Sequence, residues 1–155
     1  MEMRELVETV RAFEGILVLA PEEGGPFPEI AWGDSFFYFA PGGEVPANTQ
    51  PFTTIVTKDY PDDTASRLGD GRWRVNVHVG SELFRELIGS SPKDAVSVDH
   101  AEADAILPHP VYAALGWVSV VNPAERTSAQ VLDLVRSAYY DAVRRADRRR
   151  SADAG

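Results

Sequence analysis

Four short β-prone segments lie between Glu29 and Val79, and they constrain the fold of this chain more than any other feature. Each is rich in aromatic or β-branched residues and is bounded by Gly, Pro, Asp or Asn, as strands usually are. The segments are residues 30–32, 36–39, 52–57 and 73–79. Gly33-Asp34 suits a two-residue hairpin turn, because glycine accepts the positive φ that such turns require. This stretch is therefore predicted to form an antiparallel β meander.

Helical and strand patterns flank the meander. Residues 2–13 show the spacing of an amphipathic helix that ends near Gly15, and residues 16–19 predict a strand buried on both faces. Residues 81–88 predict a second helix, with Ser81 as its N-cap and Gly89 at its end. Residues 117–121 predict a last strand.

The clearest helix start in the sequence is at Thr127. Thr127 and Gln130 have the spacing of a capping box and stand directly before an apolar run. The helix that follows is predicted to lie across the sheet through one apolar stripe. Its members are Val131, Leu134, Val135, Ala138, Tyr139 and Ala142.

These elements predict the fold class α+β. The expected architecture is a two-layer α/β sandwich with a mainly antiparallel sheet, an N-terminal helix, one middle helix and a long C-terminal helix. A chain of 155 residues fits one domain, which we place at residues 1–143. Residues 144–155 carry five Arg and two Asp, a net +3 against −12 for the rest, and predict a basic, frayed tail.

Composition excludes several functional classes. The chain has no cysteine, which removes thiol nucleophiles and cysteine zinc sites and suits a reducing cytoplasm. Its net charge of −9 makes nucleic acid an unfavourable partner, since phosphate binding relies on clustered Lys and Arg. The acidic start has no export signal, and no apolar run is long enough to span a membrane. We expect a cytoplasmic protein.

Four motifs carry a resemblance over nearly the whole chain. They are PEIAWGDSFFYFAP (28–41), FTTIVTKDYP (52–61), RVNV (74–77) and HPVYAALGWVSVVNP (109–123). In this order and spacing they resemble an uncharacterised bacterial family, a domain of unknown function. The closing strand and long helix are also similar to the MmcQ/YjbR-like fold, a two-layer α/β domain loosely related in shape to secretion chaperones. The resemblance implies a fold and no activity.

Common catalytic and cofactor motifs do not fit this chain. Gly33-Asp34-Ser35 resembles the nucleophile motif of GDS-type esterases, but a strand follows it and the chain has no Asp-x-x-His. The glycine pairs match no phosphate-binding loop, so no cofactor is predicted. The histidines at 78, 100 and 109 are scattered, and the acidic clusters at 59–63 and 99–104 are typical of solvated loops, so no metal site is predicted.

A row of polar side chains on the strand 73–79 is the most suggestive feature. Arg74, Asn76 and His78 alternate with Trp73, Val75, Val77 and Val79, so they share one face of the sheet. Neighbouring segments provide further candidates for a ligand groove on that face, although the solvent-facing side of a half-covered sheet is the simpler explanation of the row. The candidate binding residues are Lys58, Asp59, Tyr60, Arg74, Asn76, His78, His109, Tyr112 and Trp117.

Two functions follow from these candidates. One is a non-catalytic binding domain that takes a small molecule or a protein partner on the open face of the sheet. The other is an acid–base enzyme in which His109 or His78 carries the proton and Arg74 holds an anionic group. An oligomer is compatible with either.

Overall fold

The computed structural model of the chain describes residues 1–69 and 71–154. One antiparallel sheet of six strands runs through the molecule in the order β1-β2-β3-β4-β6-β5. The strands are β1 (Ile16–Leu19), β2 (Ser35–Phe39), β3 (Thr53–Val56), β4 (Arg74–His78), β5 (Leu107–Pro108) and β6 (Trp117–Val121). The predicted α+β fold class is confirmed, whereas the likeness to the MmcQ/YjbR-like fold stays a prediction.

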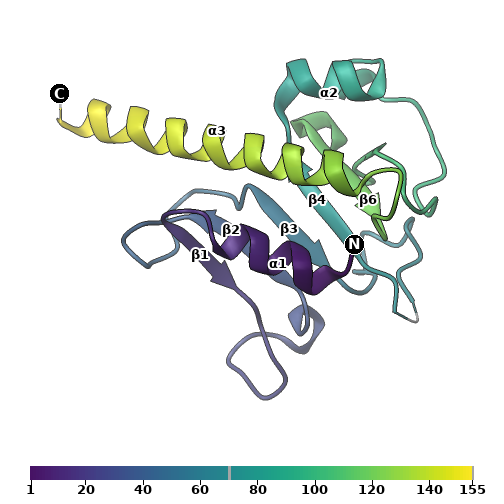
Figure 1. The fold of residues 1–155 in the computed structure, drawn as a ribbon, viewed down its shortest axis with the longest axis horizontal. Helices are drawn as coiled ribbons and strands as arrows, with labels where there is room; N and C mark the ends of the chain where they lie inside the picture. Colours follow the sequence, from purple (N-terminus) through teal and green to yellow (C-terminus); the bar gives the residue numbers. More distant parts are fainter. Residues whose placement is uncertain (70, 155) are drawn as a thin grey trace.

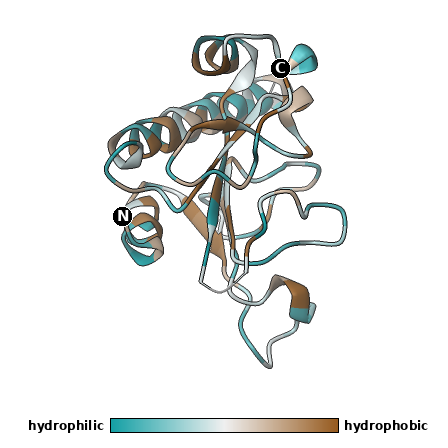
Figure 2. Ribbon diagram, turned by 90° about the vertical axis from the view of Figure 1, so that its right-hand side faces the viewer, coloured by the Kyte–Doolittle hydropathy of each residue, from teal (hydrophilic) through white to brown (hydrophobic). Residues whose placement is uncertain are grey.

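All three α-helices cover the same face of the sheet. They are α1 (Met3–Arg11), α2 (Gly80–Ile88) and α3 (Ser128–Ala154). Figure 1 shows α3 lying across the strands, and in the view of Figure 2 the helices α1 and α3 stand on one side of the sheet and long loops on the other. Every second residue of β2, β3, β4 and β6 points toward the helices, and the core forms there. Its fully buried members include Leu6, Phe37, Ile55, Val75, Phe84, Val118, Val131 and Val135.

The apolar stripe predicted for the last helix packs into this core. Val131, Leu134, Val135, Ala138 and Tyr139 are buried, and Ala142 packs beside them. The Tyr139 hydroxyl donates to the carbonyl of Glu14 at 2.6 Å, which ties α3 to the segment that leads into β1. Because these positions recur with the helical period of 3.6 residues, they form one apolar face of α3, and that face lies against the sheet.

The start of α3 differs from the predicted capping box. The Thr127 hydroxyl donates to the carboxylate of Asp104 at 2.6 Å, and the backbone N–H groups of Ala124, Arg126 and Thr127 donate to the same carboxylate. These hydrogen bonds lower the pKa of Asp104 to about 2. A side chain from a distant loop therefore satisfies the exposed amides before the helix, and Gln130 is not needed for that purpose.

The start of α2 also differs from the prediction. The helix begins at Gly80 after Val79, and no side chain caps it, so Ser81 is not the N-cap. The N–H groups of Val79 and Gly80 instead donate to the carbonyl of Gly116, at 2.9 and 3.2 Å. The predicted end is confirmed, because Gly89 adopts the left-handed conformation there with φ 92°.

The first segment of the predicted meander is not a strand. Residues Glu29–Ala31 form a short 3-10 helix, η1, and β2 pairs with β1 instead. Gly33 takes a positive φ of 89°, but its N–H donates to the carbonyl of Pro21 within a folded loop rather than turning a hairpin. The predicted segment 30–32 has only three residues, too few to compete with the longer β1 for that edge. As an edge strand, β1 is half-buried along its length, which corrects the expectation of burial on both faces.

The basic segment continues the last helix, since α3 runs on to Ala154. Figure 1 shows this half of α3 projecting beyond the sheet. Fraying of the tail and the boundary at residue 143 stay predictions, and Gly155 lies outside the described residues. Within the described chain, no helix combines the length and the apolar character that crossing a bilayer requires.

Candidate functional site

A cavity of about 690 Å³ opens on the face of the sheet that the helices leave uncovered. Its floor is made by four adjacent strands, and Phe36, Thr54 and Asn76 are direct neighbours across them. The Asn76 side-chain amide donates to the Thr54 hydroxyl at 2.9 Å, which links two strands along the floor. The floor residues are Phe36, Tyr38, Thr54, Val56, Arg74, Asn76 and Trp117.

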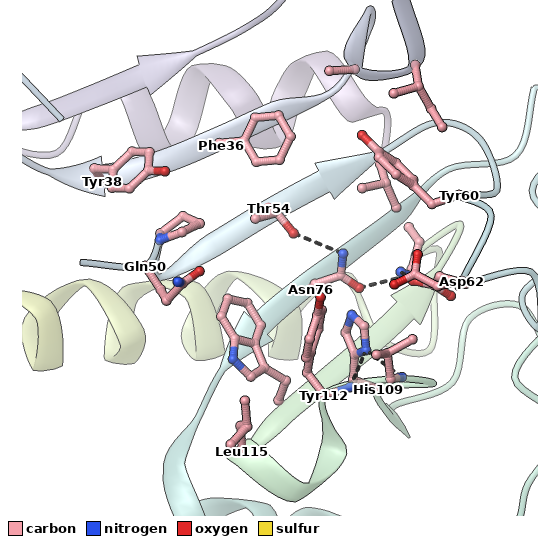
Figure 3. Close-up of a pocket in the computed structure, with 18 of the residues that line it drawn as sticks. Phe36, Tyr38, Gln50, Thr54, Tyr60, Asp62, Asn76, His109, Tyr112 and Leu115 are labelled. Atoms are coloured by element: carbon pink, nitrogen blue, oxygen red, sulfur yellow. Dashed lines mark hydrogen bonds and ion pairs between the residues drawn. The ribbon is translucent and has the colours of Figure 1, made fainter. Parts of the chain in front are cut away.

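Loops from four parts of the chain form the walls. They contribute Pro28, Ile30 and Ala31; Gln50 and Pro51; Tyr60, Asp62 and Asp63; and His109, Val111, Tyr112 and Leu115. Figure 3 shows Tyr38 and Gln50 at one end of the cavity and Tyr60 and Asp62 at the other. Aromatic and aliphatic groups dominate the lining, and a few polar groups lie among them, as in small-molecule sites.

Arg74 is buried at the polar end and is held by its neighbours. Its guanidinium forms a two-pronged ion pair with Asp63, at 3.0 and 2.5 Å. It also donates to the side-chain amide oxygen of Asn76 at 2.8 Å and to the Ser66 hydroxyl at 2.8 Å. Burial raises the pKa of Asp63, but the hydrogen bonds and charge of Arg74 outweigh it and leave that pKa lowered. Arg74 and Asn76 are each only 2% exposed, so this row is not a plain solvent-facing surface.

His109 lies beside this network with a fixed tautomer. Its Nδ1 accepts hydrogen bonds from the backbone N–H groups of Val111 and Tyr112, both at 3.0 Å, so the ring proton sits on Nε2. Burial and then the charge of Arg74 lower the pKa of His109 to about 3. The ring also packs against Tyr112 in a tilted arrangement, with centroids 5.0 Å apart. At neutral pH, His109 is therefore an uncharged hydrogen-bond donor on the cavity wall.

Lys58 and Asp59 lie outside the cavity, whereas Tyr60 lines it. Lys58 donates to the Trp32 carbonyl at 2.6 Å and pairs with buried Asp34 at 3.2 Å. Asp34 also accepts a hydrogen bond from the Tyr60 hydroxyl, and burial followed by that contact raises the pKa of Tyr60. The Asp59 carboxylate accepts the N–H of Leu68 at 2.9 Å and shapes the loop. These groups hold the wall in place.

His78 is separated from His109 by Trp117. The Trp117 ring centroid lies 5.5 Å from that of His78 and 6.4 Å from that of His109. His78 Nε2 donates to the carbonyl of Leu115 at 3.0 Å, and burial followed by the charge of Arg145 lowers its pKa. It lines a second pocket rather than the cavity. Of the nine predicted site residues, the cavity therefore brings together Tyr60, Arg74, Asn76, His109, Tyr112 and Trp117.

A family model matches residues 1–151 of the chain. The chain belongs to DUF6194, a family of unknown function. The expectation of an uncharacterised family is thereby confirmed, and membership assigns no chemistry. No curated protein and no solved structure matches the chain.

The cavity combines paired charges with open hydrogen-bonding groups. The guanidinium of Arg74 is neutralised by Asp63, and in the described chain Asp62 is the lining carboxylate that makes no ion pair. No group of three or more His, Asp or Glu side chains suited to a metal ion occurs among residues 1–69 and 71–154. The site can enclose a flat apolar molecule and offer it hydrogen bonds from His109 and the polar floor.

Sequence reasoning missed several residues of the site. Alternation along residues 35–39 and 53–56 could have placed Phe36, Tyr38, Thr54 and Val56 on the same face as Arg74. No sequence signal pointed to Asp63 or Ser66 as partners of Arg74, because a loop folds back to bring them there.

Proposed function

We propose that this protein is a non-catalytic binding domain that holds a small, uncharged, largely aromatic molecule in the cavity on the helix-free face. The observation that carries the proposal is the aromatic cavity of about 690 Å³, with the neutral His109 ring and the Asn76 amide at its polar end. Its size falls within the roughly 300–1,000 Å³ typical of small-molecule sites.

The charges around the cavity support an uncharged ligand. An anion would have to compete with Asp63 for Arg74 in a buried pair, and breaking such a pair is costly. Asp62 adds a negative charge at the same end, which opposes an anion further. A neutral molecule with one hydrogen-bond acceptor meets no such penalty, and His109 Nε2–H can donate to that acceptor.

The same geometry argues against an acid–base enzyme built on these residues. A proton carrier works best with a pKa near the operating pH, and His109 has a pKa of about 3. Its Nδ1 is occupied by two backbone amides. His78 lies in the other pocket and donates to a backbone carbonyl. The binding role is therefore the better supported of the two functions.

The test is a binding screen by ligand-observed NMR with neutral aromatic probes such as indole and phenol, each paired with a carboxylated analogue. We expect the neutral probes to bind more tightly than the charged ones. Tyr112→Ala removes an exposed wall residue that packs against His109, and should weaken binding about tenfold, or about 1.4 kcal/mol.

Tyr140→Ala is the matched control, because Tyr140 is a similarly exposed tyrosine on α3 away from the cavity. It should leave binding unchanged. Equal losses in both variants, or tighter binding of the carboxylated probes, would show that the cavity is not the neutral-ligand site proposed. Failure of every probe to bind would also overturn the proposal, and would favour a protein partner at the exposed rim residues Ile30, Val111 and Leu115.

A further inference from the structure

A second pocket lies at the end of the sheet, where α3 projects past the strands. It has a volume of about 410 Å³ and is bounded by α3 on one side and the loop before β3 on the other. The two pockets share a wall, because four residues line both of them: Gln50, Pro51, Leu115 and Trp117. The pocket is lined by Phe39, Asn48, Thr49, Gln50, Pro51, Phe52, His78, Leu115, Trp117, Ala142, Arg145 and Arg149.

The charge in this pocket is one-sided. Its lining contains two arginines and, among the described residues, neither Asp nor Glu, although the chain carries a net charge of −9. The arginines next along the helix are neutralised locally, since Arg144 pairs with Asp141 and Arg150 pairs with Asp147. A protein with a net negative charge thus places at one pocket two arginines that make no ion pair among the described residues.

Arg145 and the exposed Arg149 both line the pocket. Arg149 donates to the Thr49 hydroxyl at 2.9 Å, which joins the helix to the loop across the hollow. Arg145 is half-buried, and no carboxylate of the described chain lies within ion-pair distance of it. Burial lowers the pKa of Arg145, and the neighbouring arginines add to that effect against the opposing charge of Asp141. An anion between the two guanidinium groups would relieve this repulsion.

We propose that this pocket is a binding site for the phosphate or carboxylate group of a small ligand, held by Arg145 and Arg149. Guanidinium groups match the oxygens of both anions in a forked geometry. The side-chain amides of Asn48 and Gln50 and the indole N–H of Trp117 supply further donors around the same space. The proposal does not rest on the function proposed for the cavity, because the two arginines that would hold the anion line this pocket only, although Gln50 and Trp117 line both.

The test is an NMR titration of the full chain with inorganic phosphate, and in parallel with acetate, at constant ionic strength kept by sodium chloride. We expect saturable shifts of the Asn48 side-chain amide and the His78 ring, which line this pocket and not the cavity, with at least one of the two anions, and their relative affinities identify the preferred group. Arg145→Gln should weaken this binding about tenfold or more, since a charge-assisted hydrogen-bonding group is lost.

Arg148→Gln is the matched control, because Arg148 is an exposed arginine of the same helix that does not line the pocket. It removes the same charge and should change the affinity less than twofold. Arg145→Lys, which keeps the charge without the fork, should fall between the two.

Three outcomes would overturn the proposal. Shifts that do not saturate, or equal losses in Arg145→Gln and Arg148→Gln, would mean diffuse attraction to the helix rather than a site. If the parent chain binds neither anion and Arg145→Gln changes the molecular mass of the protein in solution, the pocket receives an acidic surface of a second copy instead. Melting curves of all variants distinguish these outcomes from loss of the fold.

Discussion

Arg74 determines the shape of the cavity floor at the scale of single residues. Its guanidinium contacts the floor through Asn76 and the overlying loop through Asp63 and Ser66. One buried cation therefore joins the sheet to a loop that otherwise crosses the open face without helical support. Such a pair is costly to leave half-made, because the remaining charge stays in a water-poor environment.

Replacing one member of this pair should destabilise the protein strongly. We expect Asp63→Asn to lower the free energy of unfolding by about 3–5 kcal/mol, because Arg74 would remain buried without a counter-charge. Urea unfolding measures the change. Asp62→Asn, at the exposed neighbouring carboxylate, should stay within about 0.5 kcal/mol of the parent. A small effect of Asp63→Asn would show that the loop can move and expose Arg74 to water.

His109 should make the free energy of unfolding fall with pH from about pH 6.5 downward, before the carboxylates begin to titrate. Its pKa is about 3 in the folded chain and about 6.5 when unfolded, so the unfolded state binds the proton first as the pH falls. The contribution of the neutral, buried His109 ring to the free energy of unfolding is fully present above about pH 6.5. It is lost progressively toward pH 3, by at most about 1.4 kcal/mol per pH unit.

Two measurements check this prediction. The NMR signals of the His109 ring should not titrate between pH 8 and 5, and His109→Asn should show a shallower loss of unfolding free energy between pH 6.5 and 5 than the parent. Asparagine is chosen because its side-chain oxygen can also accept the N–H groups of the following turn. A His109 signal that titrates near pH 6.5 would contradict the buried neutral ring and revive an acid–base role.

At the scale of elements, the joint between β4 and α2 depends on a close approach of two glycines. A Cβ added at Gly116 would lie 3.1 Å from the Cα of Gly80, and Gly116 has a φ of 86°. The same Gly116 carbonyl accepts the N–H groups of Val79 and Gly80. This contact sets where α2 leaves the sheet and where β6 begins.

Gly116→Ala should therefore be destabilising. We expect a loss of at least about 1–2 kcal/mol from the left-handed conformation alone, and more from the contact with backbone atoms that cannot move aside. Gly42→Ala is the control, because a Cβ there meets no neighbouring atom and no positive φ is required. It should be neutral or slightly stabilising. Thermal unfolding of the two variants side by side checks the difference, and equal stability would mean that the joint rearranges.

Periodic patterns along the sequence were sufficient to predict most of these elements. The alternation of β4 and the stripe of α3 each repeat over several residues, so local spacing determines which side chains face the core. The segment 30–32 offered only three residues and was wrongly predicted as a strand. The contacts of Asp104 with Thr127 and of Asp63 with Arg74 join residues far apart along the chain, and spacing carries no information about such pairs. For that reason the sheet face that carries the site was predictable from the sequence, but the loops that fold over it and enclose the cavity were not.

At the scale of the whole molecule, the last part of α3 contributes little to the core. The apolar stripe ends at Ala142 and Val143, and beyond it the described contacts to the rest of the chain include the exposed bond from Arg149 to Thr49. The fold of residues 1–143 should therefore be independent of the tail.

A chain truncated after Val143 should fold and unfold cooperatively. We expect a loss of about 1 kcal/mol or less, because an exposed polar contact is worth little. Circular dichroism during urea unfolding measures this, with the full chain as reference. Loss of cooperative unfolding would contradict the domain boundary predicted at residue 143. Retention of phosphate binding by the truncated chain would separately contradict the assignment of the second pocket, since Arg145 is removed.

The absence of helices on one face of the sheet has a consequence for how such a protein can diversify. The helix-backed face supplies the apolar core, whereas the loop-covered face supplies the cavity lining, and the four strands β2, β3, β4 and β6 contribute alternate residues to both. A substitution at Phe36, Tyr38 or Val56 can thus reshape the chamber while the residue beside it keeps the helices in place. The ligand preference of such a protein can therefore change through substitutions at alternate strand positions, without a change of fold.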